Sequence, residues 1–429
     1  MRLLISFAAL FLSVLLLQVS SGGVAPLDAL SGLKLDFTTT QIGLLGSAHF
    51  VGFFIGCWWA PRLMGSVGPS RAFAAFTGFG GIGLLAHMLV IDAYAWAVMR
   101  VATGLCVAGC YTVIEAWIMA KVTNANRGRA LGVYRGIDMT GSLAAQLMIG
   151  VLAPASYVSY NILALLCCAS LLPLTLTTVS PPKTKAAPRL APRLALARSP
   201  LGVLGAMVAG LTTGSFRMIG PVYGDGVGLT PAQIGWFLAA FVAGGAVAQY
   251  PAGWLADRFD RRRVLIGLSA AAIAASGVMS LIGQSGPAAI MTASALFGFA
   301  TFPIYSVSCA HAHDFATTEE RVELSAALLF YYALGAIASP LVASALIGAF
   351  GPPAMFAMIA LGHVGLIAYG LARMAAGRTR RTQTKYVYAP RTSFTLGRMT
   401  RRIREAESTP APKTAPESTV ENPEQSSKS

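Results

Sequence analysis

The sequence predicts an all-α, polytopic membrane protein with twelve transmembrane helices in two six-helix halves. Composition is the first observation: of 429 residues, 55% are hydrophobic and only 11% are charged, and the mean hydropathy is +0.63. Soluble domains carry about 25% charged residues, so this deficit favours a membrane protein. The second observation is the recurrence of apolar segments of about 20 residues, the length that crosses a hydrocarbon core. The third is an internal repeat.

The repeat consists of two similar stretches that lie far apart in the chain. Thr38-Thr-Thr-Gln-Ile-Gly and Thr230-Pro-Ala-Gln-Ile-Gly each close a polar loop and open a long apolar helix. Each helix then runs into a basic turn, at residues 62–71 and 257–263. Duplication into two parallel halves is typical of many secondary transporters, in which the substrate site lies between the halves near the middle of the bilayer.

Twelve segments have the length and hydropathy of a membrane span, six in each half. They cover residues 3–26, 41–62, 71–91, 95–119, 128–150, 156–178, 201–222, 233–255, 264–283, 287–310, 324–349 and 354–375. The predicted organisation is an N-terminal half (1–178), a basic linker (179–200), a C-terminal half (201–376) and a tail (377–429). The end of the tail is rich in Glu, Pro, Ser and Thr, and we expect it to be disordered because it cannot bury enough apolar area.

The net charge of +15 is distributed according to topology. If the N-terminus is cytoplasmic, the outward loops contain one base, Lys34, and the acids Asp28, Asp36, Asp92 and Asp225. The remaining loops, the linker and the tail contain the other bases outside the spans. This asymmetry follows the positive-inside rule and predicts that both termini and the linker are cytoplasmic. The charge therefore gives no reason to expect nucleic acid as a partner.

Sequence patterns of enzymes and nucleotide-binding proteins are missing. The chain has no Gly-rich phosphate loop followed by Lys-Ser or Lys-Thr, no nucleophile elbow and no His-Glu-x-x-His motif. His311 and His313 lie near Asp314, but two histidines and one acid do not make a closed metal-ligand set. We predict no catalytic residue, no metal and no cofactor, and an intramembrane enzyme ranks last among the function classes.

Charged residues inside the predicted spans are the sharpest functional signal. Five that lie away from the span ends are Arg100, Glu115, Arg135, Asp138 and Arg217. Each costs about 2.5–3.5 kcal/mol or more unless it is paired or solvated. From the helical rise, Glu115 and Arg135 lie at similar depth on consecutive antiparallel helices. Tyr111 shares a helix face with Glu115, and Asp138 shares one with Arg135. We predict that these four residues form one polar cluster facing the cavity of the first half.

Two interpretations of this cluster stay open. Glu115 and Arg135 could form a structural ion pair that holds the fourth and fifth helices together. Alternatively, the cluster handles substrate or protons, and Asp138 is then the better proton carrier because one arginine cannot fully neutralise two acids. Arg217, late in the seventh span, either lines the cavity or extends to the outer surface.

The stretch from Gly253 to Arg263 resembles the signature cytoplasmic loop of the major facilitator superfamily, Gly-x-Leu-Ala-Asp-Arg-x-Gly-Arg-Arg, with Asp260 in place of the usual glycine. An acid that pairs with arginines and a helix end on one side of the bilayer would favour one state of an alternating-access cycle. The candidate residues of this latch are Asp257, Arg258, Arg261, Arg262 and, in the first half, Arg62. The first-half counterpart lacks the acid, and the alternative is that these charges only anchor the loops inside.

A second resemblance covers the fourth and fifth spans. Arg100-Val-Ala-Thr-Gly104 with Gly109 is similar to the fourth-helix motif of the superfamily, in which the arginine faces the cavity. The block at residues 98–146 resembles the YcaD-like branch of bacterial permeases. These resemblances imply a monomeric secondary transporter in the lipid bilayer of a bacterial inner membrane. It would move a small-molecule substrate by alternating access, with protons as a candidate coupling ion.

The alternative function is a membrane sensor or assembly partner with the same fold, which would use the long basic tail instead of transporting a solute. The intramembrane charges distinguish the two. A sensor could lose Asp138 and Glu115 without losing its signal, whereas a coupled carrier should stall.

Overall fold

The computed structural model describes residues 2–122, 127–176, 190–317 and 319–375, together with Tyr386, Ala389 and Thr392. Most of the predicted linker and tail therefore lies outside the described residues. The first half contains α1 (Arg2–Lys34), α2 (Thr39–Val67), α3 (Pro69–Ala86), α4 (Ala93–Lys121), α5 (Arg127–Met148), α6 (Tyr157–Ala169) and α7 (Leu171–Thr175). The second contains α8 (Pro192–Arg198), α9 (Pro200–Gly226), α10 (Pro231–Arg258), α11 (Arg261–Leu281), α12 (Pro287–Thr301), α13 (Pro303–His313), α14 (Arg321–Phe350) and α15 (Ala354–Ala375).

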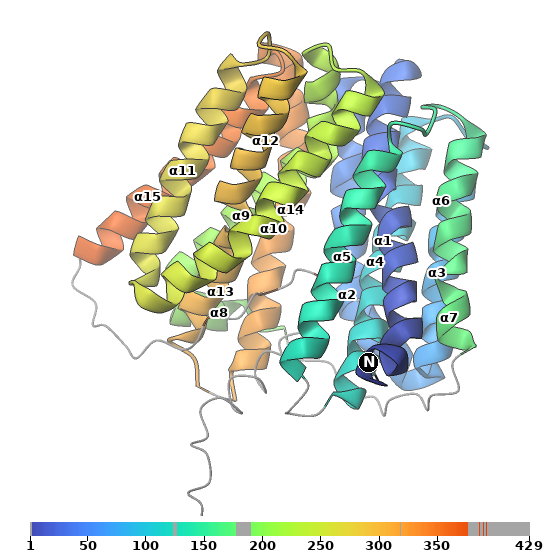
Figure 1. The fold of residues 1–429 in the computed structure, drawn as a ribbon, viewed down its shortest axis with the longest axis horizontal. Coiled ribbons are helices and arrows are strands. Elements are labelled where there is room, and N and C mark those ends of the chain that lie inside the picture. The colour runs from blue at the N-terminus through green and yellow to red at the C-terminus, as the bar shows by residue number, and fades with distance from the viewer. Residues whose placement is uncertain are drawn as a thin grey trace, which may run out of the picture.

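The helices form two bundles that stand side by side, one from each half of the chain (Figure 1). Within the described ranges, ten segments are long and apolar enough to cross a membrane, with α6–α7 and α12–α13 each forming one of them. The expected spans 71–91 and 128–150 correspond to α3 and α5, which lie alongside the others in Figure 1 but are not among those ten. The all-α, polytopic architecture is confirmed. The total of twelve membrane spans stays a prediction, because it requires α3 and α5 to be spans as well.

The repeated sequence motif is a pair of helix N-caps. The hydroxyl of Thr38 accepts from the backbone N–H of Gln41, and the Gln41 side chain accepts from the backbone N–H of Thr38. Thr230 and Gln233 make the same reciprocal pair at the start of α10. This capping box satisfies N–H groups that a helix start leaves without partners, so it fixes where α2 and α10 begin.

We call the end of the bundle at which α2 and α10 begin the capped end, and the opposite end, which contains Arg62 and residues 258–263, the basic end. The two halves are in close contact near the capped end. A methyl group added at Gly43 of α2 would lie 2.7 Å from the carbonyl oxygen of Pro340 in α14. One added at Gly235 of α10 would lie 2.6 Å from the carbonyl oxygen of Gln146 in α5. Glycine therefore lets helices of opposite halves approach backbone to backbone and close this end.

The first helix extends further than the sequence predicts. The expected span ended at residue 26 and placed Asp28 in an outward loop, but α1 continues to Lys34 with Pro26 inside it. Leu27 and Leu30 are buried in this last part of the helix, so continuing the helix extends the apolar packing. Asp28 is consequently only 2% exposed, and it requires a partner inside the protein.

Candidate functional site

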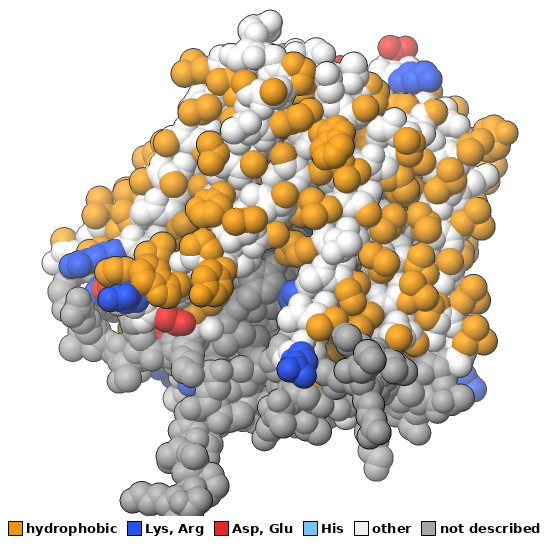
Figure 2. All heavy atoms as spheres, viewed as in Figure 1, with side chains coloured by type: hydrophobic (Ala, Val, Ile, Leu, Met, Phe, Trp, Pro, Cys, Tyr) orange, Lys and Arg blue, Asp and Glu red, His pale blue; other side chains and the backbone are white. Residues whose placement is uncertain are grey.

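A cavity lies between the two halves. Together with the solvent space at its mouth it has a volume of about 1010 Å³. The first half contributes Tyr111, Arg135 and Asp138 to its wall, and the second half contributes Arg217 and Tyr332. Figure 2 shows one face of the molecule, on which hydrophobic side chains cover both halves. The glycine contacts close the molecule at the capped end.

The four residues predicted to form one polar cluster lie together on α4 and α5. Arg135 lies between the two acids: its Nη2 is 3.7 Å from Oε1 of Glu115, and its Nη1 is 3.6 Å from Oδ2 of Asp138. The hydroxyl of Tyr111 lies 2.6 Å from Oδ1 of Asp138. These distances correspond to two loose ion pairs and one short hydrogen bond.

The two acids of the cluster have different surroundings. Asp138 lines the cavity, and 13% of its side chain is exposed. Glu115 is fully buried behind the cavity wall and accepts a hydrogen bond of 2.9 Å from the hydroxyl of Tyr134. The hydroxyl of Thr392, a described residue of the tail, also donates to Glu115. Solvent and a solute in the cavity can therefore reach Asp138 but not Glu115.

The hydroxyl of Tyr111 lies between two oxygen atoms. It is 2.5 Å from Oε1 of Gln18 on α1 and 2.6 Å from Oδ1 of Asp138. A hydroxyl has a single proton to donate, so one of these contacts takes its proton from the partner. Either the Gln18 amide presents its N–H₂ group, or Asp138 is protonated. The geometry thus accommodates both protonation states of Asp138.

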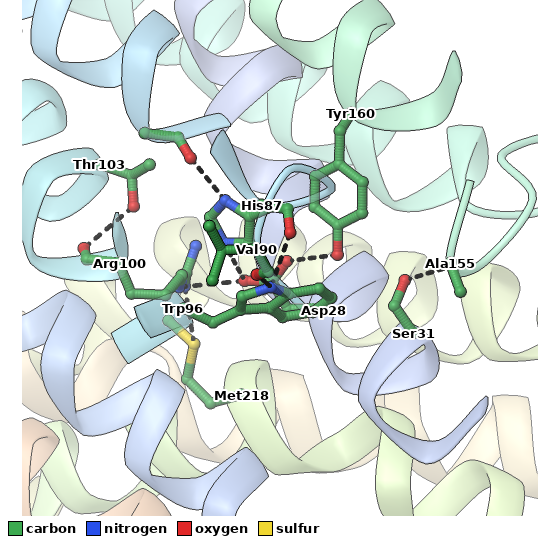
Figure 3. Close-up of polar contacts among 11 residues, drawn as sticks. Asp28, Ser31, His87, Val90, Trp96, Arg100, Thr103, Ala155, Tyr160 and Met218 are labelled. Carbon is green, nitrogen blue, oxygen red and sulfur yellow. Dashed lines mark hydrogen bonds and ion pairs between the residues drawn. The ribbon is translucent and has the colours of Figure 1, made fainter. Parts of the chain in front are cut away.

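The other two intramembrane arginines lie apart from this cluster. Arg217 of α9 lines the cavity from the second half. Arg100 of α4 does not face the cavity as its motif predicts, and is 1% exposed. Its Nε lies 3.4 Å from Oδ2 of Asp28, and Oδ1 of the same acid accepts from the hydroxyl of Tyr160 at 2.8 Å (Figure 3). The physical reason is charge compensation: Asp28, inside α1, is the nearest acid.

Sequence reasoning missed Asp28 and His87, the two residues that accompany Arg100. His87 Nε2 lies 3.5 Å from Oδ2 of Asp28. A signal for Asp28 was present, because the residues after Pro26 keep an apolar helical pattern and Arg100 had no acid assigned to it. Nothing in the sequence indicated His87, since its position depends on how the end of α3 meets α1 and α6.

The predicted latch residues at the basic end contact their own half or the tail. Arg261 is 1% exposed, and its Nη1 donates to Asp314 at 2.7 Å and to the carbonyl of Ala310 at 2.8 Å. Asp257 lies 3.5 Å from Nη2 of Arg261 and accepts a hydrogen bond of 2.5 Å from the backbone N–H of Tyr386. Arg261 therefore ties α11 to the end of α13, and Asp257 lies at the edge of that contact.

The remaining basic residues of the latch make local contacts. Arg62 and Arg258 lie over the rings of tryptophans one turn earlier, Trp58 and Trp254, at 4.1 and 5.3 Å from the ring centroids. Arg262 pairs with Asp260 at 2.8 Å. Partial burial acts to raise the pKa of Asp260, but hydrogen bonds from the side chain and backbone of Arg262 lower it overall. Asp260, which replaces the usual glycine, caps α11 by accepting from the N–H of Arg262.

Comparison with known proteins identifies the architecture. The family model described as Major Facilitator Superfamily matches residues 7–225 and 202–404. An uncharacterized MFS-type transporter of Yersinia pestis (strain Pestoides F) is 28% identical over 342 residues, which cover 79% of this chain and 88% of that protein. The uncharacterized MFS-type transporter YcaD of Escherichia fergusonii is 28% identical over 356 residues, covering 82% of this chain and 91% of that one.

Two solved structures have the same fold. The nucleoside transporter NupG superposes with a TM-score of 0.70 at 15% identity, over 85% of this chain and 98% of that one. A bacterial homologue of the human lysosomal transporter Spinster, in an inward-facing and occupied conformation, gives a TM-score of 0.66 at 17% identity over 95% and 99% of the two chains. At sequence identities this low, the two superpositions show only that the folds are alike. The family match over both halves, with the paired helical bundles and the cavity between them, places this multi-pass membrane protein in the major facilitator superfamily of transporters.

Proposed function

We propose that this chain is a secondary active transporter that moves a small solute across a bacterial inner membrane by alternating access. The observation that carries this proposal is the cavity between the halves, whose wall combines Arg135 and Asp138 from the first half with Arg217 from the second. A charged site shared by two halves is accessible from one side when the halves close at the other. Rocking one half against the other would then expose the same residues to the opposite side.

The distribution of bases supports an inward-open orientation. Bases concentrate at the basic end and in the linker and tail, and the positive-inside rule places such segments in the cytoplasm. α1 begins and α15 ends at that same end (Figure 1), which agrees with an even number of passes and cytoplasmic termini. The cavity would then be open to the cytoplasm, and the glycine contacts at the capped end would close the outer side.

The charges of the cavity support a solute with an anionic group, either an organic anion or a zwitterion. Arg135 and Arg217 line the cavity together with a single acid of the first half, Asp138. Guanidinium groups bind carboxylate and phosphate groups through paired hydrogen bonds. Asp138 is the candidate for proton coupling, because it is accessible from the cavity and its contact with Tyr111 accommodates a protonated carboxyl.

The experiment that tests this proposal has two steps. Purified protein is first screened by thermal shift against sugars, amino acids, organic acids and drug-like amines, because binding to the native state raises the unfolding temperature. The stabilising solutes are then tested for uptake into proteoliposomes with an imposed pH gradient. We expect an anionic or zwitterionic solute to be accumulated, and Arg217→Gln to weaken its binding about 10- to 100-fold, since a hydrogen bond to a charged group contributes about 1.5–3 kcal/mol.

A matched control is Arg263→Gln, which removes an arginine at the basic end that does not line the cavity. Equal loss of binding in both variants would show that Arg217 acts only through general stability. Stabilisation by solutes without uptake above that of empty vesicles would contradict transport and favour the second candidate, a sensor or assembly partner. That candidate is favoured by one observation, the contacts of Tyr386 and Thr392 of the tail with Asp257 and Glu115.

A further inference from the structure

Three residues of the tail, Tyr386, Ala389 and Thr392, lie against helices of both halves. Tyr386 contacts α10, Ala389 contacts α13, and Thr392 contacts α4. The helices α10 and α13 belong to the second half, whereas α4 belongs to the first. All three helices end at the basic end, so the tail has contacts with both halves on the side opposite to the glycine contacts.

Tyr386 lies along one face of α10. The face consists of Gln249, Gly253 and Asp257, which are spaced by four residues and therefore lie one above the other. The backbone N–H of Tyr386 donates to Asp257 at 2.5 Å, and its hydroxyl donates to Oε1 of Gln249 at 3.2 Å. A methyl group added at Gly253 would lie 2.9 Å from Cδ1 of the Tyr386 ring. Gly253 thus provides the space for the ring, and the contact extends over two turns of the helix.

Ala389 is bound through its backbone to Ser306 of α13. The Ser306 side chain is buried, at 1% exposure. Its Oγ accepts from the backbone N–H of Ala389 at 3.2 Å and lies 3.5 Å from the carbonyl oxygen of the same residue. A buried hydroxyl without a hydrogen bond is costly, so these contacts stabilise the tail where it lies.

Thr392 reaches the polar cluster of the first half. Its hydroxyl donates to Glu115, and the residue itself lines the central cavity. A solute that occupies the cavity therefore shares its space with Thr392. Charge is complementary as well: residues 378–404 contain several bases and no acid, while Asp257 and Glu115 are the acids that they meet.

We propose that the face of α10, Ser306 and Glu115 form a docking site for the chain's own tail, and that the docked tail opposes closing of the basic end. Asp257 is the acid of the candidate latch, and in this arrangement it binds the backbone of Tyr386. Closing would bring α4 toward α10 and would require the space that the tail occupies. A contact made in only one of two states shifts the equilibrium toward that state.

The two parts of this proposal depend differently on the proposed function. Docking of the tail needs neither a solute nor transport. Its effect on the equilibrium rests on the alternating access proposed above, and makes the tail an inhibitor that belongs to the same chain.

The first test measures docking in the full-length chain, in a background without the six native cysteines. Ser306→Cys and Ala389→Cys are introduced together and oxidised with copper phenanthroline. Because Oγ of Ser306 lies 3.2 Å from the backbone nitrogen of Ala389, we expect this pair to form a disulfide about tenfold faster than a control pair. The control combines Ser306→Cys with Ala411→Cys, further along the tail, and reports random collisions.

The second test measures the distance across the basic end. Spin labels are placed at Val67 and Leu196, exposed positions near this end in opposite halves. The double variant Tyr386→Ala/Thr392→Val removes the ring from α10 and the hydroxyl from Glu115. We expect the ratio of short to long distances to rise about fivefold or more, as for the loss of one hydrogen bond. A control, Tyr250→Ala, removes an exposed tyrosine of α10 and should match the parent protein.

Two results would overturn the proposal. One is disulfide formation at equal rates in the two cysteine pairs, which would mean that the tail has no docking site at Ser306. The other is a distance distribution in the double variant that equals that of the parent protein while solute uptake is observed, because the protein would then alternate without control by the tail. A lack of uptake, by contrast, would contradict the proposed function and would leave the disulfide result unchanged.

Discussion

Arg135 lies between two acids that have different surroundings. It lies 3.7 Å from Glu115, which is fully buried, and 3.6 Å from Asp138, which faces the cavity. One guanidinium therefore lies between two carboxylates, of which only Asp138 is accessible from the cavity. The acid that solvent can reach is the candidate for exchanging a proton during a transport cycle.

Asp138→Asn is expected to preserve folding and membrane insertion but to abolish proton-driven accumulation of the solute. Asparagine keeps the size of the side chain and can still accept from Tyr111, so the cluster stays packed, but it cannot carry a proton. Exchange of labelled solute across the membrane should continue. Proteoliposomes with an imposed pH gradient separate the two activities. Full gradient-driven uptake by this variant would exclude Asp138 as the proton carrier.

Glu115→Gln is expected to destabilise the protein. Glutamine can still accept from Tyr134, but Arg135 then loses one of its two acids at a depth where a poorly compensated charge is expensive. We expect a loss of about 1–3 kcal/mol in unfolding free energy, seen as a lower melting temperature in detergent. Asp138→Asn serves as the comparison, because its side chain is partly exposed to the cavity. Equal melting temperatures for Glu115→Gln and the parent protein would contradict a structural role for this ion pair.

At the scale of elements, the turn between α10 and α11 combines a rigid and a labile contact. Arg261 is buried and bonded to the end of α13, whereas the side chain of Asp257 is 46% exposed and 3.5 Å from its arginine. The short, buried contact of Arg261 with Asp314 holds α11 and α13 together. The longer, exposed contact of Asp257 with Arg261 can be replaced by a contact with a residue of the first half. This difference is what a conformational latch requires.

Asp257→Asn is therefore expected to shift the equilibrium between states without lowering stability strongly. If Asp257 pairs across the basic end only when that end is closed, its loss favours the conformation with the basic end open. Spin-label distances across the capped end should then move to shorter values than in the parent protein. Identical distance distributions, with the variant folded, would assign these residues to anchoring of the loop alone.

The junction between α8 and α14 should respond to acid. Glu320 accepts two hydrogen bonds from Arg198, and these, with the backbone N–H of Thr317, lower the pKa of Glu320. Because the folded-state pKa is below the unfolded value, the stabilisation is present above about pH 4.3 and is lost as the pH falls through the folded pKa. The protection factors of the α8 amides, which correct for the intrinsic slowing of exchange in acid, should fall on acidification through this range. In Glu320→Gln they should be low already at neutral pH.

At the scale of the whole molecule, glycines allow helix backbones of the two halves to touch near the capped end, and a cavity lies between the halves further along. Gly43 and Gly235, one in the capped helix of each half, occupy equivalent positions five residues after Thr38 and Thr230. The duplication thus reproduces both the N-cap and the close approach that follows it. Symmetric contacts of this kind suit a pair of rigid bundles that rock about a central site.

Orientation in the membrane is the prediction at this scale. Single cysteines introduced at Leu190 and Val420, in a background without the six native cysteines, should not react with an impermeant reagent in intact cells. Both should react after the membrane is permeabilised, which controls for accessibility. Labelling of either position in intact cells would contradict cytoplasmic placement of the linker and the tail.

The sequence by itself determined the class of the molecule. Apolar segments of spanning length, the low fraction of charged residues and the duplicated Thr-x-x-Gln caps are local features, so an all-α membrane protein with paired halves follows from them. Helical spacing also placed Tyr111, Glu115, Arg135 and Asp138 together, because these residues lie on two consecutive helices joined by a short loop. Geometry along one helix and across one loop can be calculated from residue numbers.

Only the tertiary structure decided which charges meet across distant helices. Arg100 pairs with Asp28 and does not line the central cavity, and His87 lies beside the same acid. These contacts form because the ends of α1, α3 and α6 meet near the capped end. The local pattern ended the first span at Pro26, whereas packing and charge compensation extend the helix to Lys34. Contacts between residues far apart in the chain depend on how helices pack, and no local periodicity encodes that arrangement.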